Sequence, residues 1–417
     1  MTEYRSRVVD AELRSRLSAT GAVLVDGPKA VGKTLTASRV AETVLRVDVD
    51  RAVRAALEVQ PEQLFTYPTP ILFDEWQEVP ELWNLVRRAV DDHGEKGLYV
   101  LTGSARPRDD ARMHSGAGQI GRLRMRPMSL YETGHSSGKV GLEGLLAGAE
   151  VTGSPTELAV PDILERVVIG GWPDLIDANE RTARTWLSDY LRNLAEIDIP
   201  GLGTRRNPGN ISRLLAGLGR SVGTPLNRSA LEIEIGGAAG PIASETLTNY
   251  LGALDRLMLV ESLPAWRPHM RSRTRLRASS VHHFVDPSLG PAALGVGVRD
   301  LLNDLEAAGH HFESLVLRDL RVYSQTLGAT LFSWRDSQTG AEVDVVLELP
   351  NGSWAAFEIQ LGEVATDSAA ASLLRFAGKV DTARHGDPLA LIVITGGRFA
   401  YQRPDGVIVV PISALGP

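Results

Sequence analysis

Residues 22–34 read AVLVDGPKAVGKT, a short apolar run that leads into a loop bounded by glycines. The stretch from Gly27 to Thr34 has the spacing G-x-x-x-x-G-K-T of a P-loop, which wraps nucleotide phosphates with backbone N–H groups. We expect Lys33 to reach the terminal phosphate oxygens and the Thr34 hydroxyl to bind Mg²⁺. The nucleotide-lining residues predicted by this spacing are Gly27, Pro28, Lys29, Ala30, Val31, Gly32, Lys33 and Thr34.

The sequence around this loop predicts an α/β fold. Short apolar runs occupy 22–25, 47–49, 71–73 and 98–101, and helical patterns cover 34–45 and 80–90. Such alternation favours a parallel sheet covered by helices on both faces. Because ligands bind at the carboxyl ends of parallel strands, we expect Asp26, Asp74 and Thr102 to lie at one edge of the sheet.

Two acidic residues follow the run 71–73. Asp74 is expected to hold Mg²⁺ through water, and Glu75 to act as the general base that polarises the attacking water. Thr102 and Ser104 follow the next run and are candidates to sense the γ-phosphate, with turn capping as the alternative. The predicted cofactors are therefore ATP and Mg²⁺.

A candidate arginine finger lies in GQIGRLRMRP, residues 118–127. Arg122 is predicted to stabilise transition-state charge, acting within its own chain or on a neighbouring copy. The alternative is a solvated strand face shared with Arg124 and Arg126.

The remaining sequence predicts further domains. Residues 133–161 are rich in Gly, Ser and Ala and are expected to form a surface connection. Residues 163–198 look helical, with a break at 170–173. Three helix-sized segments then end at 244–258, and a strand-like LVESL follows, which is the order of a winged helix-turn-helix. The final third has the order helix (312–325), three strands (330–335, 342–349, 354–361), helix (366–379) and strand (389–395).

Carboxylates gather in this final third. On a strand, Glu342 and Asp344 share one face, and Glu358 and Gln360 share another in the same way. Glu313, in the preceding helix, can add a third carboxylate. We predict Asp344 and Glu358 as ligands of Mg²⁺ or Mn²⁺, with a solvated acidic strand face as the alternative.

An alternating row of arginines occupies positions 271, 273, 275 and 277. On a strand these side chains would project from one face about 7 Å apart, a spacing that suits nucleic-acid phosphates. The alternative is a charged edge strand that discourages aggregation.

Composition excludes several classes of function. The chain has 417 residues, a net charge of −7, and 43% hydrophobic and 23% charged residues, as is typical of globular proteins. It has no cysteine, which excludes disulfides, thiolate catalysis and Cys-ligated zinc. The charged N-terminal segment and the lack of a long apolar run predict a cytoplasmic protein without membrane contact.

The chain resembles a prokaryotic family of AAA-like P-loop ATPases. The resemblance covers nearly all of it and rests on GPKAVGKT, ILFDEWQEVP, YVLTGSA, GRLRMRPMSLYE, GGWP, YLRNLAEIDI, FESLV, SWRDSQTGAEVDVV and FEIQ. It implies ATP hydrolysis at Lys33, Thr34, Asp74 and Glu75, and a C-terminal domain of unknown function related to PD-(D/E)xK nucleases. The implied domains are 1–135 (AAA-like P-loop ATPase), 136–205 (linker and helical segment), 206–290 (winged helix) and 291–417 (nuclease-like).

The tail departs from the nuclease pattern at one position. Where that family has Glu-x-Lys, this chain has Glu358-Ile-Gln360. A neutral amide cannot supply the positive charge that lysine places beside the developing phosphorane. We therefore expect the tail to lack nuclease activity.

The leading interpretation is a nucleotide-driven switch that hydrolyses ATP and engages DNA or a protein partner through its two C-terminal modules. The alternatives are an ATP-dependent metal nuclease of a defence type and an interaction scaffold in which ATP is only structural. A small-molecule kinase is disfavoured, because nothing past residue 130 resembles a lid or acceptor pocket. The sequence leaves a homo-oligomer open.

Overall fold

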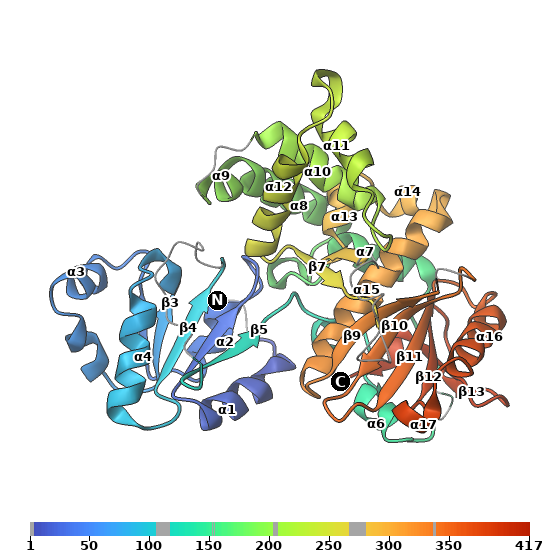
Figure 1. The fold of residues 1–417 in the computed structure, drawn as a ribbon, viewed down its shortest axis with the longest axis horizontal. Helices are drawn as coiled ribbons and strands as arrows, with labels where there is room; N and C mark the ends of the chain where they lie inside the picture. Colours follow the sequence, from blue (N-terminus) through green and yellow to red (C-terminus); the bar gives the residue numbers. More distant parts are fainter. Residues whose placement is uncertain are drawn as a thin grey trace. The chain divides into compact units, whose positions relative to one another are not determined.

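The computed structural model describes residues 4–105, 117–151, 153, 155–202, 207–266, 281–336 and 339–417. The chain divides into two compact units, whose elements Figure 1 labels. The first unit comprises Met1–Arg126 with Ala253–Leu259, and the second comprises Pro127–Gly252 with Val260–Pro417. The boundaries of the four expected domains remain predictions.

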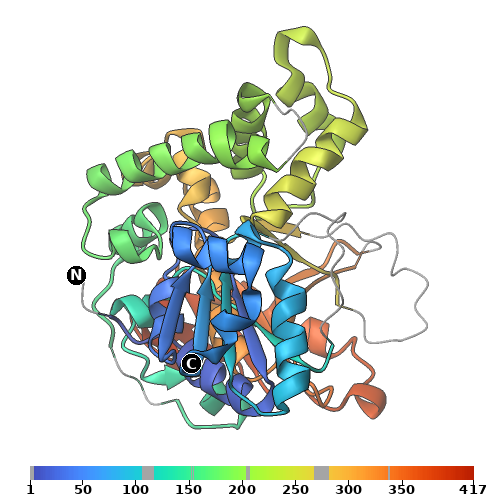
Figure 2. The same cartoon turned by 90° about the vertical axis from the view of Figure 1, so that its left-hand side faces the viewer.

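The first unit is built around a five-stranded parallel sheet, as the sequence predicts. In Figure 2 this unit is turned toward the viewer. Its strand order is β2-β3-β4-β1-β5, so β4 separates β1 from β3. The strands are β1 (Ala22–Asp26), β2 (Thr43–Arg46), β3 (Ile71–Asp74), β4 (Tyr99–Gly103) and β5 (Ile120–Arg124). The helices before and between them are α1 (Val9–Ala19), α2 (Lys33–Ser38), α3 (Arg51–Val59) and α4 (Leu82–His93).

The central strands are buried, which is why they read as continuous apolar runs. All residues of β3 and β4 are buried, and so are the first four of β1. Phe73 and Tyr99 pack with the ring of Phe65, and Trp76 packs on Trp83 of α4. This core fixes the ends of the strands that carry the polar residues.

The structure corrects the sequence expectation for residues 34–49. Helix α2 ends at Ser38 instead of continuing to 45, and β2 covers Thr43–Arg46 instead of 47–49. The N–H groups of Arg39 and Val40 bond three residues back, which tightens and ends the helix. The N–H of Thr43 then bonds to the Pro70 carbonyl, so sheet pairing overrides the local helical pattern.

The middle of the chain is helical. It contains α7 (Val160–Ile169), α8 (Glu180–Asn193), α10 (Pro208–Arg220), α11 (Arg228–Gly236) and α12 (Ser244–Arg256). An antiparallel pair follows, β7 (Val260–Leu263) and β8 (Val281–Phe284). Three helices and a strand pair therefore occur in the expected order.

Residues 133–161 are not only a surface connection. Their β6 (Val140–Gly141) pairs in parallel with β15 (Leu415–Gly416), and α6 (Leu142–Leu146) follows it. Leu142 and Leu145 are buried. The sequence did not predict this pairing, because the segment is rich in Gly and Ser and its partner strand lies far along the chain.

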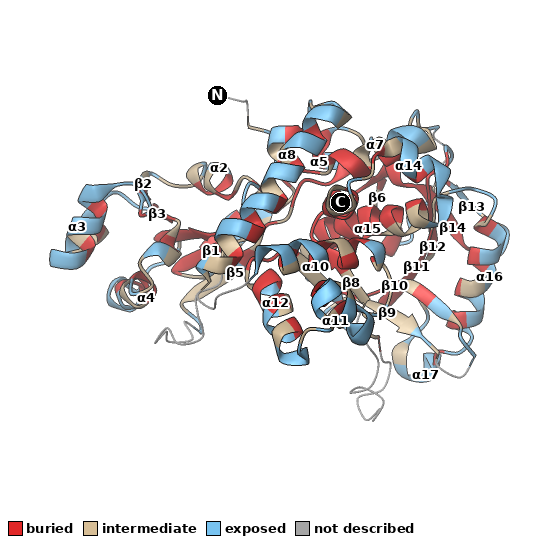
Figure 3. Ribbon diagram, turned by 90° about the horizontal axis from the view of Figure 1, so that it is seen from above, coloured by how far each residue is buried: buried red, intermediate tan, exposed pale blue. Residues whose placement is uncertain are grey.

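The C-terminal part folds around a six-stranded sheet of order β13-β14-β12-β11-β10-β9. Its elements are α15 (Leu305–Gln325), β9 (Thr330–Arg335), β10 (Glu342–Glu348), β11 (Trp354–Gln360), α16 (Thr366–Ala377), β12 (Leu391–Thr395), β13 (Tyr401–Gln402) and β14 (Ile408–Pro411). Through Leu373 and Phe376, α16 covers the apolar face of the sheet. Much of α15 is buried, as Figure 3 shows.

Among the described residues, the structure contains no helix that combines the length and apolar character required to span a bilayer.

A buried ion-pair network joins four distant segments of the second unit. Arg318, on α15, contacts the carboxylates of Asp286 at 3.1 Å and Asp319 at 2.7 Å, and all three side chains are buried. Asp286 also accepts from the Gly171 N–H, and Asp319 from the Leu130 N–H. One buried cation thus ties α15 to the segments around residues 130, 171 and 286.

We predict that Arg318→Ala lowers the free energy of unfolding by about 3–5 kcal/mol, because it leaves two carboxylates buried without their cation. Arg192→Ala is the matched control, since Arg192 pairs with Asp189 at the surface with both side chains 59% exposed. It should change stability by less than about 0.5 kcal/mol. Urea unfolding followed by far-UV circular dichroism measures both, and equal effects would contradict the prediction.

Candidate functional site

The P-loop connects β1 to α2 by a backbone that needs its glycines. Gly32 has φ 90°, and a Cβ on Gly27 would lie 2.2 Å from the carbonyl oxygen of Met125 on the neighbouring strand segment. Ala30 also has a positive φ, of 64°. The loop is therefore tightly curled and held against the end of β5, as the sequence spacing requires.

Lys33 lies folded over this loop. Its side-chain amine donates to the Pro28 carbonyl at 2.8 Å, and the residue is 5% exposed. Burial lowers the pKa of Lys33 to about 8, and the nearby carboxylates of Glu75 and Asp74 only partly oppose that change. The amine is thus positioned on the loop where phosphate oxygens are expected.

Asp74 is the point where the strand ends converge. Its Oδ1 accepts hydrogen bonds from the Thr34 hydroxyl at 2.8 Å and from the Thr102 hydroxyl at 2.5 Å. Because β4 lies between β1 and β3, Thr102 can bridge the two sides of the site. The structure brings together the two predicted Mg²⁺ ligands, Thr34 and Asp74, and places the Thr102 hydroxyl on Asp74.

Glu75 follows directly, with a left-handed backbone of φ 55°. Its carboxylate accepts from the Gln77 side-chain amide and from the Ser104 hydroxyl, the latter at 3.1 Å. A Cβ on Gly103 would lie 2.9 Å from Gln77 Oε1 and from Trp76 Nε1, so a larger residue there would force these side chains to shift. The hydrogen bond from its hydroxyl to Glu75 places Ser104 beside the expected base.

Gln77 and Arg124 are site residues that the sequence reasoning missed. The signal for Gln77 was its position two residues after Glu75 in DEWQ. Arg124 pairs in register with Asp26, at the carboxyl end of β1, and its guanidinium lies 3.8 Å from the Asp26 carboxylate. Arg124 is placed beside Asp26 by the register in which β1 and β5 pair, and this register cannot be deduced from the sequence alone.

Arg122 lies elsewhere within its own chain. It pairs with Leu24, two residues before the strand end, and its guanidinium lies over the Trp83 ring, 5.8 Å from the centroid. The structure therefore does not bring Arg122 to the phosphate loop of its own chain. A role in a neighbouring copy remains a prediction.

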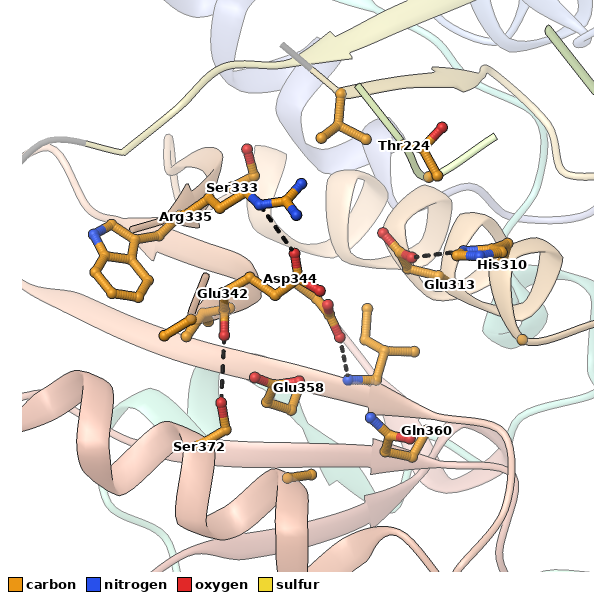
Figure 4. Close-up of a pocket in the computed structure, with 18 of the residues that line it drawn as sticks. Thr224, His310, Glu313, Ser333, Arg335, Glu342, Asp344, Glu358, Gln360 and Ser372 are labelled. Atoms are coloured by element: carbon orange, nitrogen blue, oxygen red, sulfur yellow. Dashed lines mark hydrogen bonds and ion pairs between the residues drawn. The ribbon is translucent and has the colours of Figure 1, made fainter. Parts of the chain in front are cut away.

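A second polar site lies in the second unit, in a cavity of about 1070 Å³. Its walls include Glu313 from α15, Glu342 and Asp344 from β10, and Glu358 and Gln360 from β11 (Figure 4). The Asp344 carboxylate accepts from the Ile359 N–H at 2.8 Å. The two predicted ligands, Asp344 and Glu358, thus line the same cavity from adjacent strands.

The cavity brings carboxyl groups together, and their pKa values are raised. Burial raises the pKa of Glu358 to about 7. The pKa of Asp344 is raised well above its usual value, mainly by burial and to a smaller extent by the negative charges of Glu313 and Glu358. His310 lies 3.9 Å from Glu313, and that carboxylate raises the pKa of His310. Within the described parts of the chain, no three acidic or histidine side chains are arranged closely enough to hold a metal ion.

The arginines at 271, 273, 275 and 277 lie outside the described residues, and so their predicted strand remains a prediction.

The fold and the loop define a P-loop domain. Residues 19–134 match the family model described as an AAA domain, which places this nucleotide-binding ATPase type at the N-terminal segment. Residues 160–300 and 308–415 match two models described as domains of unknown function, DUF8612 and DUF4143. The segment around the P-loop is therefore similar to AAA domains, which supports a nucleotide-binding P-loop ATPase.

Two relatives are similar to this chain over nearly its whole length. Uncharacterized proteins of Mycobacterium tuberculosis and Mycobacterium bovis are each 25% identical over 412 residues, which is 97% of this chain and 83% of the relative. A solved structure of a RuvB variant from Thermotoga maritima is 18% identical and covers 62% of this chain and 86% of its own. Its TM-score of 0.24 is too low to define a shared fold.

We predict that ATP affinity falls as the pH rises through 8. Bound phosphate favours the charged amine of Lys33, and the charged fraction decreases above its pKa of about 8. The dissociation constant should rise by up to about tenfold per pH unit above that value. Titration of ATP between pH 7 and 10 checks this. Lys33→Arg, which stays charged over the whole range, should show little slope, and an equal slope would contradict the assignment.

Proposed function

We propose that this chain is an ATP-driven switch that hydrolyses ATP with Mg²⁺ and engages DNA or a protein partner through its C-terminal modules. The observation that carries the proposal is the shared acceptor Asp74, on which the Thr34 and Thr102 hydroxyls converge beside Lys33. This arrangement joins the phosphate loop to the acidic strand end.

The residues of the site fit Mg²⁺. The Thr34 hydroxyl and the Asp74 carboxylate lie 2.8 Å apart and supply the hard oxygen ligands that this cation prefers. Thr34 would bind the ion directly and Asp74 through water. When bound, Mg²⁺ neutralises charge on the phosphate oxygens.

The chain's own residues would divide the chemistry. Lys33 leaves the Pro28 carbonyl and pairs with the terminal phosphate oxygens. Glu75 accepts a proton from the attacking water, and its hydrogen bonds from Gln77 and Ser104 hold the carboxylate in one orientation. Before Glu75 can accept a proton from water, these two hydrogen bonds must break or leave one carboxylate oxygen accessible to water. Because this rearrangement adds a step to each turnover, we expect hydrolysis to be slow.

Partner engagement is proposed for the second unit. The order α10, α11, α12, β7, β8 supports a winged helix. An isolated β-bridge also joins Pro225, in the loop between α10 and α11, to Val281 of β8. Asn249 is exposed on α12, the helix that would enter a DNA groove. A homo-oligomer, in which Arg122 reaches the site of a neighbouring copy, is part of the same proposal.

The test is ATP turnover with and without duplex DNA, single-stranded DNA and RNA. Stimulation by one polymer would support a nucleic-acid partner. Turnover that none of them changes would favour a protein partner, and no turnover at all would favour a scaffold in which ATP is structural.

We predict that ATP·Mg²⁺ stabilises the protein through the P-loop. Ligand at about a hundredfold its dissociation constant should add about 2.7 kcal/mol of apparent stability by mass action. Lys33→Ala should abolish this effect in thermal unfolding. Glu75→Gln should keep the stabilisation and lose turnover, because the amide preserves shape but cannot take a proton. Equal thermal shifts in wild type and Lys33→Ala would sink the nucleotide assignment.

A metal-dependent nuclease is the second candidate, favoured by the carboxylates of Glu313, Asp344 and Glu358 around one cavity. Gln360 opposes it, because it supplies no positive charge beside them. We predict that the full chain cuts no DNA with Mg²⁺ or Mn²⁺, as measured on supercoiled plasmid. Metal-dependent cutting that disappears in Asp344→Ala would show that the cavity is a nuclease site.

A further inference from the structure

Helix α12 ends in a strained turn. The Leu259 N–H bonds to the Leu254 carbonyl at 3.0 Å and the Met258 N–H to the Asp255 carbonyl at 2.9 Å, which together form a Schellman motif. Met258 occupies the left-handed position of this motif with φ 61° and is 1% exposed. Glycine is usual there, and a residue with a side chain is disfavoured.

Arg124 contacts this turn. Its Nη2 donates to the Met258 carbonyl at 3.4 Å, a long distance for a hydrogen bond from a charged group. Residues 253–259 belong to the same compact unit as the P-loop, so this contact lies within that unit. The bond joins the end of β5 to the last turn of α12.

The same arginine borders the phosphate loop. It pairs in register with Asp26, the residue before Gly27, and its guanidinium lies 3.8 Å from the Asp26 carboxylate. Its positive charge is also one of the influences that lower the pKa of Lys33, although burial is the largest. A phosphate group beside Lys33 would therefore attract Arg124 as well.

We propose that Arg124 senses the γ-phosphate and transmits its presence to the end of α12. This inference rests on the proposed nucleotide function. Without nucleotide, Arg124 bonds to the Met258 carbonyl and helps hold the strained turn. With ATP, its guanidinium turns to the phosphate oxygens, for which a planar fork of donors is well suited, and the Met258 carbonyl loses that bond.

The chain continues directly from this turn into β7, which begins at Val260. Release of the turn therefore alters the segment that connects the P-loop unit to the strand pair of the second unit. ADP lacks the γ-phosphate and should leave the turn in place. Arg124 would act as a positioning residue that distinguishes ATP from ADP.

Hydrogen exchange of the peptide 253–263 tests the proposal in a Glu75→Gln background, which holds ATP uncleaved. We expect ATP·Mg²⁺ to speed exchange in this peptide about tenfold relative to ADP·Mg²⁺, which corresponds to about 1.4 kcal/mol of lost protection. Adding Arg124→Gln should make exchange fast without nucleotide and equal in ATP and ADP. Arg87→Gln, which removes a partly buried arginine paired with Asp91 in the same unit, should leave the difference intact.

Arg124→Lys provides a second variant if Arg124→Gln does not fold. It keeps the charge and the aliphatic stem but loses the fork, and the difference between ATP and ADP should shrink markedly. The sensing role is overturned if ATP binds but peptide 253–263 exchanges equally with both nucleotides, or if the difference persists in the Arg124 variants. ATP binding is measured by thermal shift in the same samples, and its absence in the parent protein would overturn the nucleotide site itself.

Discussion

The second unit depends on the burial of one positive charge. Removing a guanidinium from water is costly, and the cost is offset only when carboxylates and further hydrogen bonds surround it. Arg318 meets this condition with Asp286 and Asp319, whose carboxylates also accept from the backbone N–H groups of Gly171 and Leu130 and thereby fix the loops that carry them. Since none of these partners can move without leaving a buried charge unpaired, α15 is held in one position. That helix also carries Glu313 to the acidic cavity.

The nucleotide site depends on a different constraint, the insertion of β4 between β1 and β3. This order separates the P-loop strand from the acidic strand and leaves room for a hydroxyl between them. Thr102 fills that room and bonds to Asp74 together with Thr34. The same edge carries Glu75, which Gln77 and Ser104 hold. Lys33, Asp74 and Glu75 and the hydroxyls of Thr34, Thr102 and Ser104 therefore each have a partner before any ligand binds, and nucleotide must exchange some of these bonds for its own.

The sequence predicted the parts of the fold that are set locally. The apolar runs predicted at 22–25, 71–73 and 98–101 form β1, β3 and β4, and the predicted order of helix, three strands, helix and strand occurs in the tail. The first tail helix begins at Leu305 instead of 312, and β13 and β14 were not predicted. The end of α2 and the start of β2 were wrong because Thr43 pairs with Pro70, a contact that local patterns do not encode. Arg124 was overlooked for a similar reason: only the register between β1 and β5 distinguishes it from Arg122. The P-loop was the strongest prediction, since its spacing specifies both backbone and chemistry.

The division of the chain has a consequence for its synthesis. The first unit contains Met1–Arg126 and also Ala253–Leu259, so a ribosome that has made only the first segment has not yet made the whole unit. The P-loop and its acidic partners can assemble early, because all of them precede residue 126. Their contact with the end of α12 must wait until more than a hundred further residues have emerged, all of which belong to the second unit. During that interval the Arg124 guanidinium is without the Met258 carbonyl to which it later donates, so the end of β5 gains this bond only after the intervening segment has been made.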